Sequence, residues 1–336
     1  MRGVAALMVA LYHWGLATTP IAQPGYLAVD FFFALSGYVL ALIYAQRMES
    51  GSLDARKFIT LRIIRFYPIY FVGHFLGALR NVALQLSDNP NAKTGIEWLL
   101  AFVFGLFMLP VPAATGNLFP LNVPAWTLFL ELAVNIVFAF GMFRWSNWVL
   151  GLIMALSAAV LVFFTGPPLL FDVGYSVETL LLGVARLGFS FPVGIILFRV
   201  MRGVKREQSF LALLPIAILA ACLFFEAPEA YRGVWESVCV FILFPVLLAA
   251  GIKYELPDFA APVFLFLGAV SYAIYAIHGP MILFVQKGVA TAGLPFLPGL
   301  IVFLAILLVA AHLVTRYFDG PVRAAINGWR ARKQAP

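Results

Sequence analysis

The chain has 336 residues, of which 63% are hydrophobic and 11% are charged, and its mean hydropathy is +0.98. Soluble domains are roughly half apolar and about a quarter charged. The apolar excess excludes soluble, disordered and fibrous proteins and predicts a protein that crosses a membrane several times. The formal charge of +7 does not indicate nucleic-acid binding, because the basic residues are scattered in loops between apolar runs. Cys222 and Cys239 lie inside apolar runs without metal or disulfide spacing, so no metal site is expected.

Ten apolar runs are long enough to be membrane spans. They cover residues 4–19, 27–45, 63–80, 125–143, 147–164, 177–198, 210–225, 234–250, 261–285 and 299–317. A shorter run, 97–109, is predicted to be a re-entrant or interfacial helix. The predicted fold class is all-α, a polytopic transmembrane bundle in which residues 1–336 form one domain and about 319–336 form a basic cytoplasmic tail.

The distribution of basic residues supports this count. With both termini in the cytoplasm, 17 of the 22 Lys and Arg residues lie inside, four lie outside, and Arg186 falls within a span. Such a bias is typical of membrane proteins. If run 97–109 crossed the membrane, the basic residues 199–206 would lie outside. The first run also resembles a signal peptide, whose removal would leave nine spans, but the residues within it favour retention.

Ionisable side chains at membrane depth are costly and mark candidate functional sites. The strongest are His13, Asp30, Glu131, Arg186 and His278. His13 has the side chain best suited to act as a base near neutral pH, although a packing role is equally compatible with its position. Asp30 flanks the same short outer loop as His13, which makes an Asp30–His13 pair plausible; capping of the second helix is the alternative.

Three further patterns are polar. Arg62 and Arg65 are three residues apart, so both project from one helix face, where they suit either phosphate recognition or lipid-headgroup anchoring. Glu131, with Asn135 on its face, is predicted to face a hydrated cavity. Ser271, Tyr275 and His278 form a polar stripe, for which hydrogen bonding between helices is the favoured interpretation.

The order and spacing of these residues resemble the acyltransferase 3 family of membrane enzymes, which acylate exported polysaccharides, peptidoglycan and small molecules. Arg2-x10-His13 is similar to the motif of the family's first helix. The strings AVDFFFALSGYVL, RIIRFYPIY, PAWTLFLE and SYAIYAIHGP resemble its other signatures, and together the motifs extend from Arg2 to Pro280. Two features differ: Arg2 directly follows Met1, which leaves open an upstream start, and Thr127 replaces the usual Ser.

The resemblance implies transfer of an acyl group, most simply acetyl, from cytosolic acyl-coenzyme A to a hydroxyl. The residues it assigns to catalysis are His13, Asp30 and Glu131. Those it assigns to acyl-coenzyme A are Arg2, Arg62 and Arg65, and those that would line the substrate site are Ser36, Trp126 and Tyr275. His13 would act as general base or acyl carrier, oriented by Asp30.

The expected acceptor is a glycan or glycolipid at the cell surface, and the expected location is a bacterial inner membrane, with membrane lipids as the other partners. The alternative function is a proton-coupled transporter in which His13, Asp30 and Glu131 relay protons. Against it, the sequence has no inverted repeat and no matched pair of broken spans.

Overall fold

Helices make up most of the computed structural model, which describes residues 1–112, 116–164 and 171–334. In lipid, every backbone polar group needs a partner within the protein, so apolar runs fold as helices. The α-helices of the described residues are α1 (Arg2–Ala17), α2 (Ala28–Leu40), α3 (Gln46–Glu49), α4 (Ala55–Gln85), α5 (Gly95–Leu106), α6 (Ala125–Ala139), α7 (Asn147–Phe164), α8 (Leu180–Val200), α9 (Leu213–Phe224), α10 (Arg232–Val238), α11 (Phe244–Lys253), α12 (Ala261–Thr291), α13 (Phe296–Leu313) and α14 (Gly320–Gln334).

Short segments connect or extend these helices. Three are π-helical: η2 (Ala41–Ala45), η6 (Cys239–Leu243) and η7 (Val314–Asp319). Four are 3₁₀-helical: η1 (Gln23–Leu27), η3 (Met142–Arg144), η4 (Phe210–Ala212) and η5 (Glu229–Tyr231). Two short strands, β1 (Glu207–Gln208) and β2 (Tyr254–Glu255), pair in parallel and add a small sheet to a fold that is otherwise helical.

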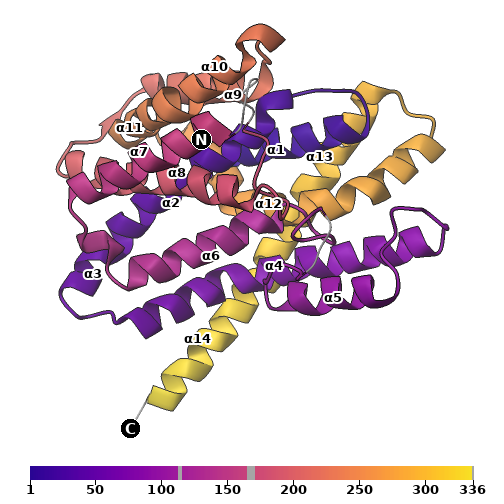
Figure 1. The fold of residues 1–336 in the computed structure, drawn as a ribbon, viewed down its shortest axis with the longest axis horizontal. Helices are drawn as coiled ribbons and strands as arrows, with labels where there is room; N and C mark the ends of the chain where they lie inside the picture. Colours follow the sequence, from indigo (N-terminus) through magenta and orange to yellow (C-terminus); the bar gives the residue numbers. More distant parts are fainter. Residues whose placement is uncertain (113–115, 165–170, 335–336) are drawn as a thin grey trace.

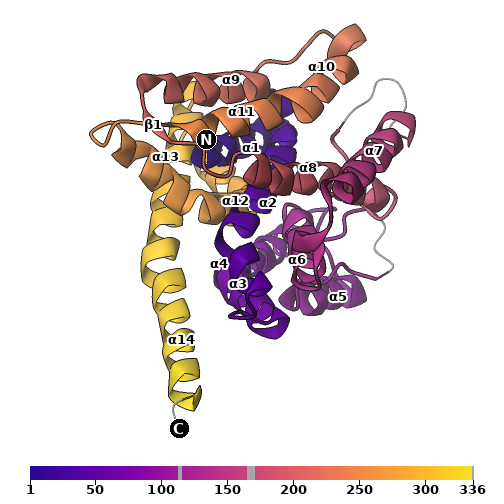
Figure 2. The same cartoon turned by 90° about the vertical axis from the view of Figure 1, so that its left-hand side faces the viewer.

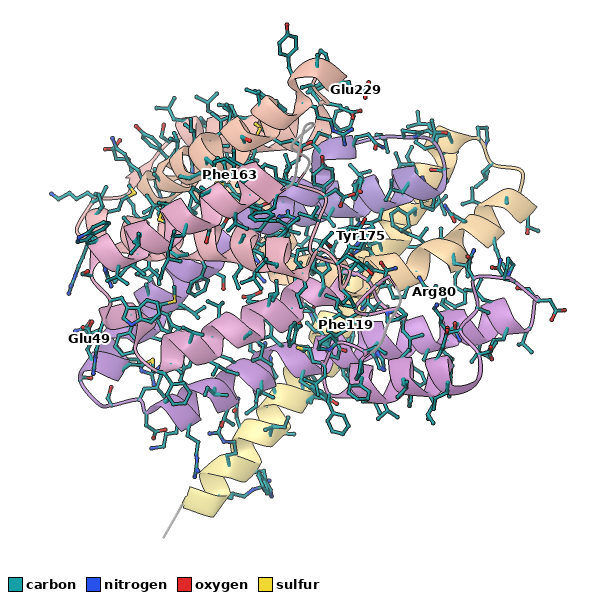
Figure 3. All side chains as sticks on the ribbon, viewed as in Figure 1. Glu49, Arg80, Phe119, Phe163, Tyr175 and Glu229 are labelled. Atoms are coloured by element: carbon teal, nitrogen blue, oxygen red, sulfur yellow. The ribbon has the colours of Figure 1, made fainter. Side chains whose placement is uncertain are left out.

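Six helical segments of the described chain are long and apolar enough to cross a membrane by length and composition. They are Gln23–Glu49, Asn147–Phe164, Leu180–Val200, Glu229–Lys253, Ala261–Thr291 and Phe296–Arg330. Phe163 on α7, labelled in Figure 3, is 79% exposed, as expected for a side chain that faces lipid. A helical, multi-pass architecture is therefore confirmed, whereas the count of ten spans and the cytoplasmic termini stay predictions.

Helix α5 is the short apolar helix expected near 97–109. It is 12 residues long and packs on α4, where the Tyr70 hydroxyl donates to the carbonyl oxygen of Gly105. A ring nitrogen of His74 lies 3.1 Å from the carbonyl oxygen of Phe102. His74 therefore supports α5, and the depth of this helix in the membrane stays a prediction.

Glycines let two pairs of helices approach closely at the centre. A Cβ atom on Gly37 of α2 would overlap the carbonyl oxygen of Phe191 on α8, and one on Gly194 of α8 would overlap that of Ala34. Likewise, a Cβ atom on Gly73 of α4 would overlap the carbonyl oxygen of Ala276 on α12. Small residues at such crossings are typical of membrane helices. The close approach at Gly37 is made by α8.

Helix α4 carries the paired arginines and begins well before its apolar run. Asp54 precedes its first turn and accepts a hydrogen bond of 2.8 Å from the backbone N–H of Lys57. This hydrogen bond holds the pKa of the exposed Asp54 carboxyl below its usual range. Because the helix is continuous from Ala55 to Gln85, Arg62 and Arg65 are fixed rigidly relative to the centre of the bundle.

The remaining packing places the two ends of the sequence beside each other. Helix α1 packs along α12, α12 packs along α4, and α2 packs along α8. Helix α14 leaves the bundle and extends away from it in both ribbon views (Figures 1 and 2). The first and twelfth helices thus bring His13 and His278 to one place.

Candidate active site

A cavity of about 710 Å³ opens between five helices of the bundle and the start of α14. The helices of the bundle are α1, α2, α4, α6 and α12. The polar residues in its lining are Arg2, Ser36, Tyr44, Arg62, Arg65, Thr127, Glu131, Ser271, Tyr272, Tyr275, Arg323 and Asn327. This volume lies within the range of small-molecule sites.

The predicted arginines converge on this cavity. Arg2, Arg62 and Arg65 all line it, although Arg2 comes from a different helix. A terminal nitrogen of Arg62 lies 3.6 Å from a carboxylate oxygen of Glu131. The same Glu131 oxygen accepts a 2.7 Å hydrogen bond from the Ser36 hydroxyl. Glu131 therefore faces a cavity, as predicted, and its partners are Arg62 and Ser36.

His13 lies against a second histidine. Its Nδ1 atom is 2.9 Å from the carbonyl oxygen of Val9 and 3.2 Å from Nε2 of His278. Nδ1 of His278 is in turn 3.1 Å from the carbonyl oxygen of Ile274. A carbonyl oxygen only accepts, so this contact assigns the proton of a neutral His278 to Nδ1 and leaves its Nε2 as an acceptor.

This arrangement determines which nitrogen of His13 is basic. Nδ1–H of His13 faces two acceptors, the Val9 carbonyl and Nε2 of His278. The neutral imidazole of His13 then has its lone pair on Nε2. The half-buried His13 ring thus presents one fixed basic nitrogen, held by contacts from α1 and α12.

Tyr275 lies between the cavity and the two histidines. Tyr275 lines the cavity, and its hydroxyl oxygen lies 2.8 Å from the hydroxyl oxygen of Thr127. Its ring centroid is 5.8 Å from that of His278. Among the described residues, His13 and His278 are not part of the cavity lining itself. The imidazoles therefore lie one layer behind the cavity, with Tyr275 at the boundary.

Asp30 pairs with Arg186 instead of with His13. The guanidinium group donates from Nη2 to Asp30 Oδ2 at 2.7 Å and from Nε at 3.2 Å. It also donates to the carbonyl oxygens of Tyr26 and Val173, and both charged side chains are 1% exposed. The sequence prediction failed because it used proximity along the chain. Asp30 shares a helix face with Gly37, and that face meets α8, which carries Arg186.

Trp126 also has a different environment from the one expected. It is 5% exposed, and the guanidinium carbon of Arg186 lies 5.7 Å from its ring centroid. Its ring packs against Gly174 and Gly183, where added Cβ atoms would collide with it. Within the described chain it is not among the residues that line the cavity, whereas Ser36 and Tyr275 are. Trp126 thus packs against the Asp30–Arg186 pair.

Several residues of this region were not predicted as site residues. The Tyr12 hydroxyl donates a 2.7 Å hydrogen bond to Asp172, and the Tyr12 ring packs against His13. Residues 116–124 and 171–179 meet there through a 2.8 Å bond from Leu118 N–H to the carbonyl oxygen of Tyr175, close to the labelled Phe119 and Tyr175 in Figure 3. Asp172 lies in a loop without a recognisable sequence pattern, so sequence reasoning missed it.

Comparison with known proteins identifies the family of this chain. Residues 1–315 match the family described as "Acyltransferase domain". The chain is 36% identical over 172 residues to "Protein 2 in picA locus" of Rhizobium radiobacter, covering 48% of this chain and 90% of that protein. It is 30% identical over 156 residues to the "Exopolysaccharide production protein ExoZ" of Rhizobium meliloti, covering 45% of each chain. It is 24% identical over 361 residues to the "Peptidoglycan O-acetyltransferase OatA" of Listeria monocytogenes, covering 96% of this chain and 55% of that protein. No solved structure matches.

The described residues thus form a helical membrane bundle with an arginine-lined cavity, and a pair of histidines lies close to that cavity. The chain belongs to the acyltransferase 3 family, as the match over residues 1–315 shows. It is therefore a multi-pass membrane acyltransferase.

Proposed function

We propose that the protein transfers an acyl group, most simply acetyl, from acyl-coenzyme A to a hydroxyl group of a cell-surface or exported glycan. The observation that carries this proposal is the cavity, which has guanidinium groups in its lining and reaches Tyr275, next to the imidazole pair. We further propose that the protein lies in a bacterial inner membrane, where cytosolic donor reaches one face and exported glycan the other.

The donor side follows from the charges. Coenzyme A carries several phosphate charges, and guanidinium groups bind phosphate oxygens through paired, charge-assisted hydrogen bonds. Arg2, Arg62 and Arg65 supply such groups from two helices. Glu131 neutralises part of this charge and holds Arg62 in place. The phosphates bind at the arginines, and the thioester extends toward Tyr275.

The chemical step uses His13. Its Nε2 takes the proton of the acceptor hydroxyl while the hydroxyl oxygen attacks the thioester carbonyl carbon. The new C–O bond forms, the C–S bond breaks, and the imidazolium returns its proton to the leaving thiolate. His278 keeps the reactive nitrogen of His13 oriented by accepting from Nδ1–H. A relay would pass the acyl group through Nε2 of His13, and intact-mass measurement after incubation with donor alone distinguishes it by an acylated enzyme.

The glycan acceptor is supported by relatives rather than by geometry. One relative is named for exopolysaccharide production and another for O-acetylation of peptidoglycan. Mass spectrometry of surface glycans from cells with and without the gene identifies the acceptor. Thermal stabilisation of the detergent-purified protein by acetyl-coenzyme A tests the donor. Stabilisation by free sugars but not by the thioester would contradict the proposal and favour the transporter.

Replacing Arg65 by Ala, or Arg62 by Ala, is expected to raise the KM for acyl-coenzyme A about tenfold or more, since each loses a charged hydrogen bond to phosphate. The measurement is the donor dependence of acylation in proteoliposomes. Arg56→Ala is the matched control, because Arg56 lies on the same helix, is exposed and is not in the cavity lining. A donor KM that does not change in Arg65→Ala would identify these arginines as lipid anchors.

Replacing His278 by Ala is expected to lower kcat about tenfold or more and leave the donor KM unchanged, because His13 loses the acceptor that orients it. His278→Gln, whose amide oxygen can accept in place of Nε2, is expected to recover part of the rate. The pH profile of kcat separates this role from packing. A profile that is displaced in His278→Ala and restored in the Gln variant supports the positioning role, and identical profiles in all three proteins contradict it.

A further inference from the structure

Helix α14 contributes to the cavity although it lies outside the matched family domain. That match ends at residue 315, whereas Gly320, Arg323 and Asn327 line the same cavity as Arg62 and Arg65. Arg323 and Asn327 are four residues apart and share one face of α14. From the sequence, this helix was predicted to be only a basic cytoplasmic tail. The structure shows that it also lines the cavity.

A buried carboxylate connects α14 to α4. Asp319, at the end of η7, is 0% exposed, and its Oδ2 lies 3.1 Å from a terminal nitrogen of Arg323 and 3.9 Å from one of Arg65. Neither carboxylate oxygen of Asp319 has a hydrogen-bond partner within the described residues, and the same holds for Nε of Arg323. Asp319 thus holds the guanidinium groups of Arg65 and Arg323 on the same side of the cavity, and neither group has all its donors hydrogen-bonded to this carboxylate.

Among the described residues, the cavity has more arginines than carboxylates, so it carries an excess of positive charge. Four arginines line it, namely Arg2, Arg62, Arg65 and Arg323. The carboxylates near them are Glu131 and Asp319. Arg62 is buried, and the side chains of Arg65 and Arg323 are 34% and 30% exposed. Guanidinium groups that outnumber the carboxylates in a partly enclosed cavity attract an anion. Arg65 and Arg323 share one carboxylate, Asp319, so their charges are only partly neutralised.

We propose that Arg323 and Asn327 form the subsite for the phosphomonoester at the nucleotide end of acyl-coenzyme A, with Asp319 positioning Arg323 and Arg65. This inference rests on the proposed function. The thioester has to reach Tyr275 near the histidines, and α14 extends out of the bundle (Figures 1 and 2). The opposite end of the donor therefore lies against α14, where Arg323 donates to phosphate oxygens and the Asn327 amide donates beside it.

The test compares two ligands with one variant. Full-length protein in detergent is titrated calorimetrically with coenzyme A and with 3′-dephospho-coenzyme A. Arg323→Ala is expected to weaken coenzyme A binding about 10- to 100-fold, the effect of losing charged hydrogen bonds, and to leave binding of the dephospho compound unchanged. The control is Arg332→Ala, because Arg332 is exposed on the opposite face of α14. This variant should bind both ligands as the original protein does.

Arg323→Ala leaves the buried Asp319 carboxylate without one of its partners and could therefore unfold the protein. Two other variants test the proposal in that case. Arg323→Lys retains the charge near Asp319 but removes the planar fork, and Asn327→Ala leaves the ion pair intact. Both are expected to reduce the preference for coenzyme A over the dephospho compound. Equal loss for both ligands, or no loss in any variant, would overturn the subsite. Failure of the original protein to bind either ligand would overturn the proposed function instead.

Discussion

Replacing His13 by Ala is expected to reduce acyl transfer about 10²- to 10⁴-fold, the usual contribution of a general base. Of the two imidazoles in the described site, Nε2 of His278 faces Nδ1 of His13, which leaves Nε2 of His13 as the nitrogen available to act as a base. Other described residues line the cavity proposed to bind the donor, so the variant should still be stabilised by acyl-coenzyme A. The measurement is acylation of a glycan acceptor in proteoliposomes, together with the thermal shift caused by the donor.

His312→Ala is the matched control for this experiment. His312 lies on α13, where its ring contacts Phe266, away from the cavity lining. Its removal should leave the rate of transfer unchanged. Activity retained in His13→Ala would reject the base assignment. Loss of both activity and donor-induced stabilisation would assign His13 to donor binding or folding.

The largest effect on stability is expected for Arg186→Leu. This substitution leaves the Asp30 carboxylate buried without its partner, which typically costs about 3–5 kcal/mol. Asp30 and Arg186 are each 1% exposed, and the guanidinium group also holds the carbonyl oxygens of Tyr26 and Val173. The free energy of unfolding in detergent, measured by denaturant titration, is expected to fall by this amount.

Two comparisons show whether the effect comes from the unpaired charge. The double variant Asp30→Leu with Arg186→Met replaces the whole pair by apolar side chains and should recover most of the loss, as for other buried pairs. Arg206→Ala breaks an exposed ion pair with Glu255 and should cost less than about 1 kcal/mol. A stable Arg186→Leu variant would contradict the view that this pair holds α2 to α8.

The charges within apolar runs were the most informative part of the sequence. Glu131 was identified because an ionisable group at membrane depth is costly, and Arg62 and Arg65 because their spacing places both on one helix face. The structure places all three on one cavity. Their helices could be recognised from hydropathy alone. The short helix α5 was also predicted from hydropathy, because its apolar run is too short to span a membrane.

Pairings between distant helices could not be predicted in this way. Asp30 and Arg186 are 156 residues apart, and the partner of His13 is 265 residues away. Which side chains meet depends on the rotation of each helix about its axis, which a neighbouring loop does not specify. Arg323 was missed because a basic helix end near a membrane has a sufficient explanation in topology.

Helix α4 fixes the distance between the arginines of the cavity and the histidine pair. It carries Arg65 at the cavity, and about two turns further on, Gly73 contacts the backbone of α12 at Ala276, beside His278. One helix and one backbone contact thus set the distance from Arg65, the proposed phosphate anchor, to the histidine pair. Loops on the other side of the histidines can change in sequence without altering this distance. Acceptor preference can therefore diverge in evolution while the donor geometry is retained.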